Sequence, residues 1–428
     1  MHSQKKGMIK TMKLIKTPTK GMNDYLPAEV ELREYVKSVI IAEYSAAGFR
    51  RIETPAVEHI ENLTGKNGGE NEKLIFKIMK RGEKLAEAGA NDAELCDSGL
   101  RYDLTVPLSR YYANNSAKLP APFLAMQIGN VWRADRPQKG RFRQFTQCDI
   151  DILGDATHTA EITLISATAG VLRKLGFDNF TVRINDRRLL KLSAEMCGFA
   201  PEDHDKVFII LDKMDKIGLD GVKNELIEEG FNAQSVEKYI SLYEGVGSVT
   251  AEDFAAGIGE QAQNVAAEIR SIMECAAAAT VGGCKLRFDP TLVRGMSYYT
   301  GTIFEVQMDG YGYSVGGGGR YDEMLGKFTG QNIPACGFSL GFERIVGALE
   351  DSGFKVPAPH KSIAFFVEKD IDNESMQKML GDANNLRAQG ERVLVTTKMK
   401  NVFFQKTRLE EDGYTEFAVY GNHTVKTI

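Results

Sequence analysis

Apolar and polar residues alternate along residues 144–153, where Gln147, Asp149 and Asp151 are spaced two apart. This period predicts a β-strand that presents all three side chains on one face. Residues 123–132 are also strand-like, and a turn-rich basic segment lies between the two runs. The pattern therefore predicts two strands joined by a loop, with a row of polar groups pointing into a cavity.

Helical and strand patterns continue on both sides of this pair. They predict, in chain order, helices at residues 28–47 and 157–175, a strand at 179–184, helices at 234–245 and 260–278, and strands at 285–287, 302–308 and 337–340. Residues 185–279 contain charge-rich helical segments and few strand signals, which indicates a helical insertion. A sheet whose strands come from both sides of an insertion is typical of an α+β fold with a largely antiparallel core.

The last part of the chain has a different pattern. After a linker at 353–361, the sequence predicts a strand at 362–367, a helix at 374–388, a strand at 392–396, a helix at 401–411 and a strand at 416–420. Short connections in this order predict a small α/β unit with mostly parallel strands. We therefore divide the chain into a basic N-terminal arm (1–16), a sheet domain (17–184 and 280–352), a helical insertion domain (185–279), the linker (353–361) and a C-terminal unit (362–428).

Composition supports an ordinary globular protein. The 428 residues can form two or three domains, and 43% hydrophobic and 26% charged residues are typical values. No apolar run approaches the roughly 20 residues that span a bilayer, and the lysine-rich N-terminus lacks the apolar core of a secretory signal. The scattered cysteines, without a CxxC pair, indicate a reducing compartment and argue against structural zinc. We expect a cytoplasmic protein that does not interact with membranes; the net charge of −5 neither predicts nor excludes RNA binding, which needs only a local basic face.

The loop between the two predicted strands is rich in cations. It contains one acid, Asp135, among Arg133, Arg136, Lys139, Arg141 and Arg143. Several guanidinium groups in a short loop suit a polyphosphate, because each planar group can bind two phosphate oxygens. The alternative is a solvated hairpin tip that binds no ligand.

This loop is one of six segments that resemble a single protein family. Its residues 136–145, RPQKGRFRQF, are similar to motif 2 of the class II aminoacyl-tRNA synthetases and in particular to histidyl-tRNA synthetases. Five further segments match that family in the right order: TKGMNDYLP (19–27), GFRRIETPAVE (48–58, motif 1), LRYDLTVPLSRY (100–111), LVRGMSYYTG (292–301, the histidine signature) and GFSLGFERI (337–345, motif 3). The ordered set covers most of the chain, which is therefore identified as a member of the histidyl-tRNA synthetase family.

The resemblance implies a fold, a reaction and partners. The fold would be α+β, with a class II antiparallel catalytic sheet, a helical insertion and a small C-terminal anticodon-binding-like α/β domain. The reaction would activate L-histidine with ATP to histidyl-adenylate and pyrophosphate, and then transfer histidine to the 3′ end of tRNA(His). A homodimer and Mg²⁺ are also implied, although no residue is assigned to the metal. The C-terminal unit looks short for this family, without the closing strands and helix, so the manner of anticodon recognition stays open.

The resemblance also assigns roles in phosphate chemistry. Arg133 would hold the α-phosphate, Arg294 would stabilise the transition state and Arg344 would clamp the γ-phosphate, and these three are the candidate catalytic residues. Further candidate contacts to ATP are Asp135, Arg141, Arg143 and Glu343. For each arginine the alternative is a surface ion pair without a function.

For histidine, the resemblance assigns four residues to the ammonium group: Asp103, Thr105, Gln147 and Asp151. The alternative for the aspartates is a charge that protects an edge strand from aggregation. Tyr298 and Tyr299 are candidates for the imidazole, which must be recognised by hydrogen bonds because shape alone discriminates poorly; we favour Tyr299. The sequence departs from the family at Ser297, where aspartate is common, and at both aspartates, where glutamate is often found.

Two further segments each have two interpretations. SVGGGGRYD (314–322) predicts a loop in which glycine allows positive φ and close backbone approach, and the resemblance places it at the floor of the amino-acid pocket. Gly337 and Gly341 would leave room for the adenine. The window 398–408 carries Phe403 and Phe404 among the cations Lys398, Lys400, Lys406 and Arg408. It could bind RNA by charge and stacking, but at helical spacing we expect the two phenylalanines to pack in the core.

Two functions of other classes compete with the synthetase. One is the non-catalytic regulatory subunit of ATP phosphoribosyltransferase, which shares this fold and lacks the anticodon domain. The short C-terminal unit favours it, whereas the retained Arg133, Arg294, Arg344, Tyr298 and Tyr299 argue against it. The other is an RNA-binding or scaffold protein without chemistry, which nothing in the pocket favours. The sequence therefore predicts a histidine-activating enzyme.

Overall fold

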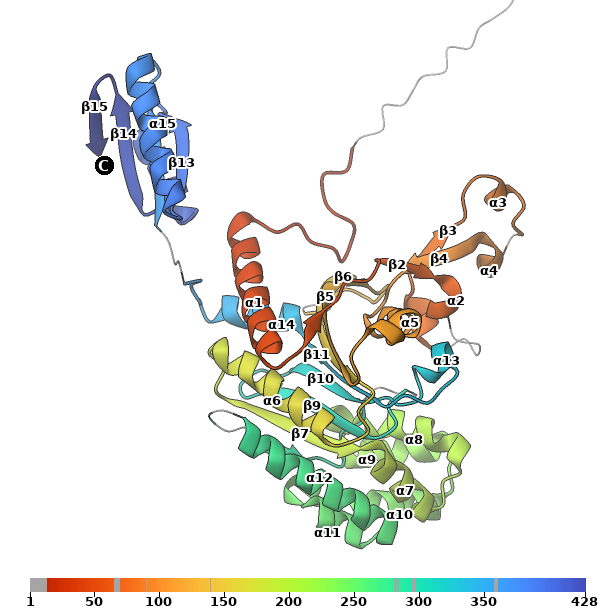
Figure 1. The fold of residues 1–428 in the computed structure, drawn as a ribbon. Coiled ribbons are helices and arrows are strands. Elements are labelled where there is room, and N and C mark those ends of the chain that lie inside the picture. Colours follow the sequence, from red (N-terminus) through yellow and green to blue (C-terminus); the bar gives the residue numbers. More distant parts are fainter. Residues whose placement is uncertain are drawn as a thin grey trace, which may run out of the picture. The chain divides into compact units, whose positions relative to one another are not determined.

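The computed structural model describes residues 14–64, 70–89, 91–138, 140–280, 282, 285–294, 298–357 and 361–428. By their internal contacts these residues form two compact units (Figure 1). The larger unit consists of the residues up to Asp24 and Val36–Asp351, and the smaller unit consists of Tyr25–Tyr35 and Ser352–Ile428. Most of the predicted N-terminal arm lies outside the described residues.

An eight-stranded sheet forms the centre of the larger unit. Its strand order is β1 (Arg50–Arg51), β5 (Phe123–Trp132), β6 (Gln144–Leu153), β11 (Ala335–Leu340), β10 (Ser314–Arg320), β9 (Thr302–Met308), β7 (Phe180–Asp186) and β8 (Lys285–Phe288). The strands from β5 to β7 pair antiparallel, and β1 and β8 at the two edges pair parallel with their neighbours. The arrangement confirms the predicted α+β fold with a largely antiparallel core.

Apolar side chains of the strands pack against the helices around the sheet. Phe123, Ala125 and Leu153 belong to a buried cluster with Leu108 and Tyr112 of α5, which spans Thr105–Asn115. This cluster fixes α5, and therefore the loop before it, against the start of β5 and the end of β6.

Three further helices cover the same sheet. α6 (Thr159–Lys174) packs on β6 and β11, and α14 (Phe342–Asp351) packs on β6 and β10. In α1 (Pro27–Ala46), the part that belongs to this unit buries residues from Val36 to Tyr44 at a spacing of four, as one helix face requires.

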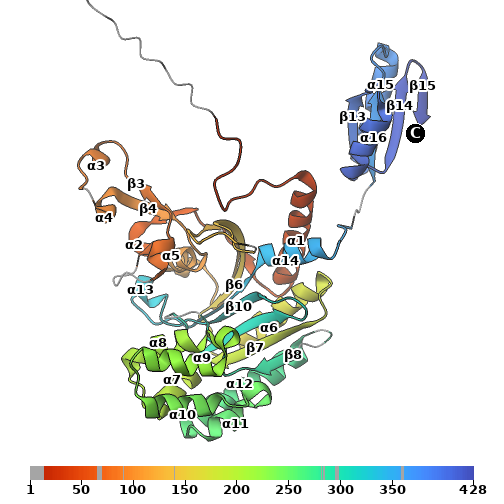
Figure 2. The same cartoon turned by 180° about the vertical axis from the view of Figure 1, so that it is seen from behind.

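A helical segment lies between β7 and β8 in the sequence. It comprises α7 (Arg187–Cys197), α8 (His204–Leu211), α9 (Met214–Glu228), α10 (Ala233–Tyr243), α11 (Ala251–Ala256) and α12 (Glu260–Ala279). Side chains of Asp186, Asn232 and Thr250 accept hydrogen bonds from backbone N–H groups in the first turns of α7, α10 and α11, which explains where these helices begin. The helices gather beside the β7–β8 edge of the sheet (Figures 1 and 2). No helix in the part of the chain that the structure describes is long and apolar enough to cross a membrane.

A small second sheet and several short helices complete the larger unit. The sheet has the order β2 (Val57–His59), β4 (Cys96–Leu100) and β3 (Lys77–Met79). The short helices are α2 (Ile60–Leu63), α3 (Glu83–Ala86), α4 (Asp92–Leu95) and α13 (Gly326–Thr329), with 3-10 turns at Glu70–Leu74, Ser116–Lys118, Pro201–Asp203 and Val246–Ser248.

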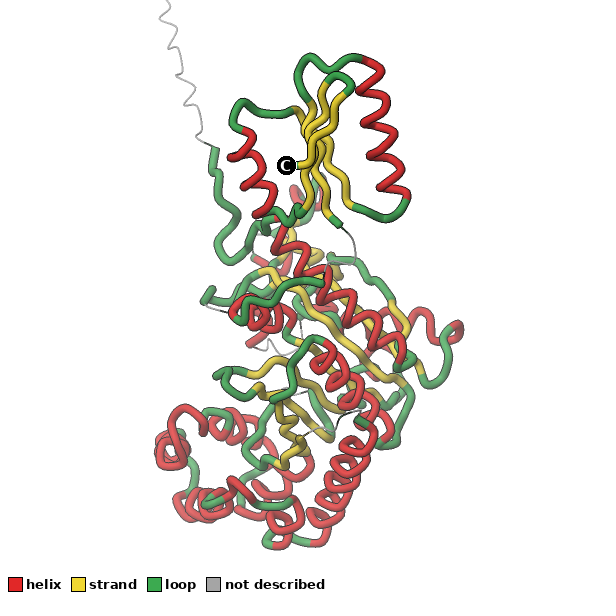
Figure 3. Tube along the Cα trace, turned by 90° about the vertical axis from the view of Figure 1, so that its left-hand side faces the viewer, coloured by secondary structure: helices red, strands yellow, loops and turns green. Residues whose placement is uncertain are grey.

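The smaller unit contains a four-stranded sheet. Its order is β13 (Arg392–Thr397), β12 (Ser362–Val367), β14 (Glu416–Gly421) and β15 (Thr424–Thr427), with helices α15 (Asn373–Ala388) and α16 (Val402–Glu411). β12 pairs parallel with both β13 and β14, as predicted. The strand β15, antiparallel to β14, was not predicted. Phe365 of β12 packs towards α15 and the next residue, Phe366, packs towards α16, so the two helices cover opposite faces of the sheet (Figure 3).

The prediction that Phe403 and Phe404 pack in a core is wrong. In α16 the side chains that face the sheet are those of Val402 and Leu409, seven residues apart. Phe403 is 76% exposed and Phe404 is 49% exposed. The periodicity allowed either face of the helix to be buried, and packing on β12 and β14 selected the one that leaves both phenylalanines outside.

The glycine run is a strand and not a loop. Residues 314–320 form β10, paired on both sides, and none of the four glycines has a positive φ. Close approach is what requires glycine here: a Cβ atom at Gly318 would lie 2.0 Å from the carbonyl oxygen of Gly337, and one at Gly319 would lie 2.6 Å from that of Thr302. The glycine run nevertheless lies at the pocket, because Gly317 is one of the residues that line it.

Candidate active site

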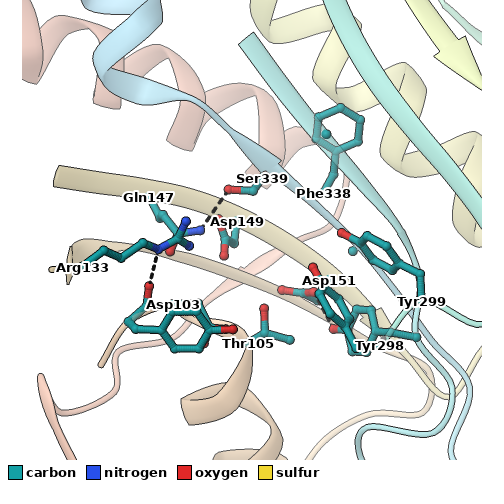
Figure 4. A pocket seen from close by; sticks show the side chains of 14 residues that line it. Asp103, Thr105, Arg133, Gln147, Asp149, Asp151, Tyr298, Tyr299, Phe338 and Ser339 are labelled. Atoms are coloured by element: carbon teal, nitrogen blue, oxygen red, sulfur yellow. Dashed lines mark hydrogen bonds between the residues drawn. The ribbon is translucent and has the colours of Figure 1, made fainter. Parts of the chain in front are cut away.

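A pocket of about 270 Å³ opens on one face of the large sheet (Figure 4). The residues that line it are Tyr102, Asp103, Thr105, Arg133, Gln147, Asp149, Asp151, Tyr298, Tyr299, Gly317, Tyr321, Gly337, Phe338 and Ser339. They come from the loop before α5, from β6, β10 and β11, and from segments that adjoin these strands. The fold thus brings together six residues that the sequence assigned to histidine, which are Asp103, Thr105, Gln147, Asp151, Tyr298 and Tyr299, and also Arg133.

Three carboxyl groups face this pocket. Asp103 accepts a hydrogen bond from the N–H of Val106 at the start of α5 (3.0 Å), and Asp151 accepts one from the hydroxyl of Tyr321 (2.5 Å). Asp149, between Gln147 and Asp151 on the same strand face, is 5% exposed and interacts with the hydroxyl of Ser339. The sequence placed Asp149 on the polar face that points into the cavity but assigned it no role in binding.

Burial raises the pKa of all three aspartates above the usual range. The charge of Asp151 raises the pKa of Asp149 further, because like charges close together disfavour ionisation. The pKa of Asp151 is raised to about 7, with burial as the main cause and the hydrogen bond from Tyr321 opposing it. The pocket is therefore prepared for a cationic group, whose binding would favour the ionised form of each carboxylate.

We expect the stability of the ligand-free protein to fall as pH rises from about 4 to about 7. In this window folded Asp151, with its pKa of about 7, keeps a proton that the unfolded chain has already lost, since its ordinary pKa is 3.8. One such proton lowers the free energy of unfolding by about 1.4 kcal/mol per pH unit. Asp151→Asn should therefore flatten the pH dependence measured by urea unfolding, in part only, because Asp103 and Asp149 are shifted in the same direction. If the free energy of unfolding of the variant has the same slope against pH as that of the wild type, Asp151 is ionised in the folded protein over the whole window from about pH 4 to about pH 7.

Aromatic side chains form another part of the pocket lining. The rings of Tyr298 and Tyr299 lie 4.2 Å apart between centroids, and their hydroxyl groups hydrogen-bond to each other. Tyr321, which follows β10, is 2% exposed and its hydroxyl reaches Asp151. The sequence did not assign Tyr321 or Ser339, because their proximity depends on how β11 pairs with β6 and how β10 pairs with β11.

Arg133 enters the pocket from the end of β5. Its Nε donates to the carbonyl oxygen of Tyr102 (2.9 Å), and its guanidinium lies about equally far from the rings of Tyr102 and Phe145, at 5.3 and 5.2 Å. These contacts orient the guanidinium towards the acid-lined side of the pocket (Figure 4).

Arg294 and Arg344 lie next to the pocket and not in its lining. Both bind Ser314: Arg294 NH2 donates to the hydroxyl oxygen (2.7 Å) and Arg344 NH1 donates to the carbonyl oxygen (2.6 Å). Burial lowers the pKa of Arg344, and the neighbouring positive charges of Arg294 and Arg141 lower it further. Three cations thus gather at one side of the pocket, which is an arrangement that an anionic chain of phosphates would stabilise.

The other residues assigned to ATP make contacts within the protein. Arg143 Nε donates to the carbonyl oxygen of Asp135 (3.1 Å), and the Arg143 N–H donates to the carbonyl oxygen of Gly21 (2.7 Å). Glu343 accepts from the N–H of Thr146 (3.0 Å) and so ties the start of α14 to β6. None of these side chains is among the pocket-lining residues that the structure describes. Lys139 and Ser297 lie outside the described residues.

Within the described ranges, no three His, Cys, Asp or Glu side chains are grouped so that they could hold a metal ion. The three pocket acids are spread along the wall and are engaged with Val106, Ser339 and Tyr321. The described residues therefore provide no preformed metal cage.

Comparisons with known proteins agree with one another. A family model described as histidyl-tRNA synthetase matches residues 21–345. A histidine–tRNA ligase from Leifsonia xyli is 42% identical over 413 residues, which cover 94% of each chain. The structure of a histidyl-tRNA synthetase from Nostoc sp. PCC 7120 is similar with a TM-score of 0.79 and 26% identity, over 96% of this chain and 93% of that one. A Bacillus halodurans protein, described as an ATP phosphoribosyltransferase regulatory subunit/histidyl-tRNA synthetase, has a TM-score of 0.77 and 22% identity over 96% of this chain and 100% of that one, which indicates a common fold alone.

Proposed function

This chain belongs to the histidyl-tRNA synthetase family, and we propose that its pocket carries out the histidine activation of that family. The protein is a histidine–tRNA ligase, which acts on histidine, ATP and tRNA. The observation that carries the assignment of the site is the juxtaposition of buried acids and tyrosines with a group of arginines. The first part suits an ammonium group and an imidazole, and the second suits a polyphosphate.

In the proposed first step a carboxylate oxygen of histidine attacks the α-phosphorus of ATP. The bond from that phosphorus to the bridging oxygen breaks, pyrophosphate leaves, and histidyl-adenylate remains. Asp103, Thr105, Gln147 and Asp151 hold the ammonium group, so that the carboxylate points towards Arg133. Arg133 and Arg294 stabilise the charge on the α-phosphate and Arg344 holds the γ-phosphate, because such reactions depend on position and electrostatics.

In the proposed second step a hydroxyl group of the terminal ribose of tRNA(His) attacks the carbonyl carbon of histidyl-adenylate. The ester to tRNA forms and AMP leaves. Asp135, Arg141, Arg143 and Glu343 support this site in the proposal by contacting ATP directly or by ordering the loop between β5 and β6. The exposed Phe403 and Phe404 of α16 are candidate contacts to tRNA, because exposed aromatic rings stack on bases.

Several finer assignments belong to the same proposal. They are a homodimer, a class II catalytic domain at 17–184 and 280–352 with the insertion at 185–279, a linker at 353–361, an anticodon-binding-like domain at 362–428, and a cytoplasmic location. Mg²⁺ is proposed as the ion that accompanies ATP, and the described residues form no cage for it.

The imidazole is the part of histidine that sets it apart from other amino acids. In the proposal the hydroxyl of Tyr299 contacts a ring nitrogen of the imidazole, and Tyr298 lies beside it. A site built to hydrogen-bond a ring rejects analogues that lack the matching groups, because its own buried polar groups would be left unpaired.

Tyr299→Phe is expected to weaken histidine binding by about 1–3 kcal/mol, because it removes a hydroxyl group that faces a polar ring in a buried site. Isothermal titration calorimetry with histidine measures the effect directly. Tyr298→Phe is the matched control, since the two rings are adjacent and their hydroxyls interact. Unchanged affinity in Tyr299→Phe, together with a loss in Tyr298→Phe, would transfer the role to Tyr298.

The test of the proposed function is ATP–pyrophosphate exchange with each of the twenty amino acids in turn. Exchange that depends on histidine alone is the expected result. A protein that binds histidine without exchange would behave as a regulatory subunit of ATP phosphoribosyltransferase does, and this would overturn the proposal for the site. The presence of Arg133, Arg294 and Arg344 beside the pocket favours exchange.

A further inference from the structure

A row of directly paired residues crosses the large sheet from the inserted helices to the pocket. Arg183 of β7 pairs with Glu305 of β9, Glu305 pairs with Gly317 of β10, Gly317 pairs with Ser339 of β11, and Ser339 pairs with Asp149 of β6. Directly paired residues present their side chains on the same face of a sheet. The row therefore lies on the face that carries the pocket, and its last three members line the pocket.

Gly317 leaves a gap in this row, and Arg294 fills it. A Cβ atom at position 317 would lie 2.5 Å from both Cζ and NH1 of Arg294. Arg294 belongs to the segment after β8 and not to the row, so its guanidinium lies on β10 in the place of a missing side chain. The cation is thereby located between Glu305 and the pocket.

Glu305 holds this guanidinium from the side away from the pocket. Nε and NH2 of Arg294 lie 2.6 and 2.5 Å from Glu305 Oε2, and NH2 also donates to the hydroxyl of Ser314. The Glu305 side chain is 16% exposed and that of Arg294 is 31% exposed, so water reaches the pair only in part. Charge-assisted hydrogen bonds of this length are strong and directional.

Arg183 binds the other oxygen of the same carboxylate. Its NH1 lies 3.4 Å from Glu305 Oε1, and its Nε lies 2.6 Å from Asp289 Oδ2. Arg183 NH1 is also 3.6 Å from Asp215 of α9, in the inserted helical segment. Glu305 is therefore fixed between two arginines, and one of them is assigned to catalysis.

We propose that Glu305 is a positioning residue that fixes the Arg294 guanidinium over Gly317 before ATP binds. The inference rests on the proposed function, in which Arg294 stabilises charge on the α-phosphate. A cation that is already oriented need not reorganise when that charge develops, which is the condition for efficient electrostatic stabilisation. Arg183 in turn restricts Glu305 to the orientation that faces Arg294.

The test compares histidine-dependent ATP–pyrophosphate exchange in the wild type, Glu305→Gln, Arg294→Ala and the double variant. Glu305→Gln should lower kcat for exchange by about 10- to 100-fold, because a small misplacement of a catalytic group has effects of this size. The histidine Kd should stay unchanged, since Glu305 does not line the pocket. In the Arg294→Ala background the same substitution should have little further effect, as is expected for two residues that act as a unit.

The control is Glu252→Gln, which alters an exposed glutamate–arginine pair: Arg270 Nε lies 2.6 Å from Glu252 Oε1. It should leave exchange unchanged. An unchanged kcat in Glu305→Gln would overturn the inference, and so would a loss that simply adds to that of Arg294→Ala, because it would indicate general damage. If the melting temperature shows that Glu305→Gln does not fold, Glu305→Asp takes its place. This substitution keeps the negative charge but shortens the side chain by one methylene, so the carboxylate lies farther from Arg294. A kcat lower than that of the wild type supports the inference, and an equal kcat overturns it. A wild-type protein without exchange would overturn the proposed function itself, which separates the two failures.

Discussion

Arg294→Ala is expected to slow histidine-dependent ATP–pyrophosphate exchange by about 10²- to 10³-fold, which is the usual cost of removing one group that stabilises transition-state charge. The guanidinium lies over Gly317 at the edge of the pocket and is held by Glu305 and Ser314. Its loss removes a cation from the group that also contains Arg344 and Arg141, so the developing negative charge has fewer partners.

Histidine binding should survive this substitution. Arg294 is not among the residues that line the pocket, whereas the proposed contacts to the ammonium group and imidazole are. Calorimetry with histidine should therefore give the wild-type Kd, and the loss should appear in kcat. Arg270→Ala is a suitable control, because Arg270 is also paired with glutamate but is 56% exposed and lies in the inserted helical segment. Exchange at the wild-type rate in Arg294→Ala would remove this residue from the mechanism.

The secondary structure was predictable where the hydrophobic period is strong. β5, β6, β9 and β12 have the predicted bounds, and α12 differs by one residue. In these elements the hydrophobic period and the local propensity favour the same secondary structure, and the tertiary contacts favour it too.

The two wrong expectations have a common physical cause. A glycine run has no period of its own, so only its pairing with β9 and β11 makes residues 314–320 a strand. α16 has more apolar residues than its contact with the sheet can cover, and the choice of Val402 over Phe403 depends on the position of β12. In both cases the deciding partner is distant in sequence, and local pattern contains no information about it.

The residues of the candidate site also fall into two groups, those that the local pattern predicts and those that depend on strand pairing. The face of β6 that carries Gln147 and Asp151 follows from their spacing, and it includes Asp149. Tyr321 and Ser339 reach the same pocket because β11 pairs with β6 and β10 with β11, which no local pattern specifies. Likewise, the pairing of Glu305 with Gly317 that supports the inference about Arg294 is a property of register and appears only in the folded sheet.

Glu161→Ala is expected to lower the free energy of unfolding by about 3–5 kcal/mol, which is the usual cost of removing one partner of a buried ion pair. Arg320 Nε and NH2 lie 2.7 and 2.8 Å from the two carboxylate oxygens of Glu161, and the Glu161 side chain is fully buried. Arg320 also donates to the carbonyl oxygens of Asp155 and Thr157 before α6. The pair therefore fixes the start of α6 to the end of β10, next to Tyr321. The variant would leave the buried guanidinium with Asp322, at 3.3 Å and 30% exposed, in place of the fully buried carboxylate.

Urea unfolding followed by circular dichroism measures this loss, and Glu252→Ala provides the matched comparison. Glu252 also pairs with an arginine, Arg270, but both side chains are largely exposed, and exposed pairs contribute about 0–1 kcal/mol. If the two substitutions cost the same, water must reach Arg320 in the variant and burial would not decide the strength of the pair. If Glu161→Ala lowers the free energy of unfolding several times more than Glu252→Ala, we also expect a change in the pocket. Tyr321 follows Arg320 directly in the chain, and its hydroxyl holds Asp151. Weaker histidine binding in the folded variant would then accompany the lower stability, whereas Glu252→Ala should leave histidine binding unchanged.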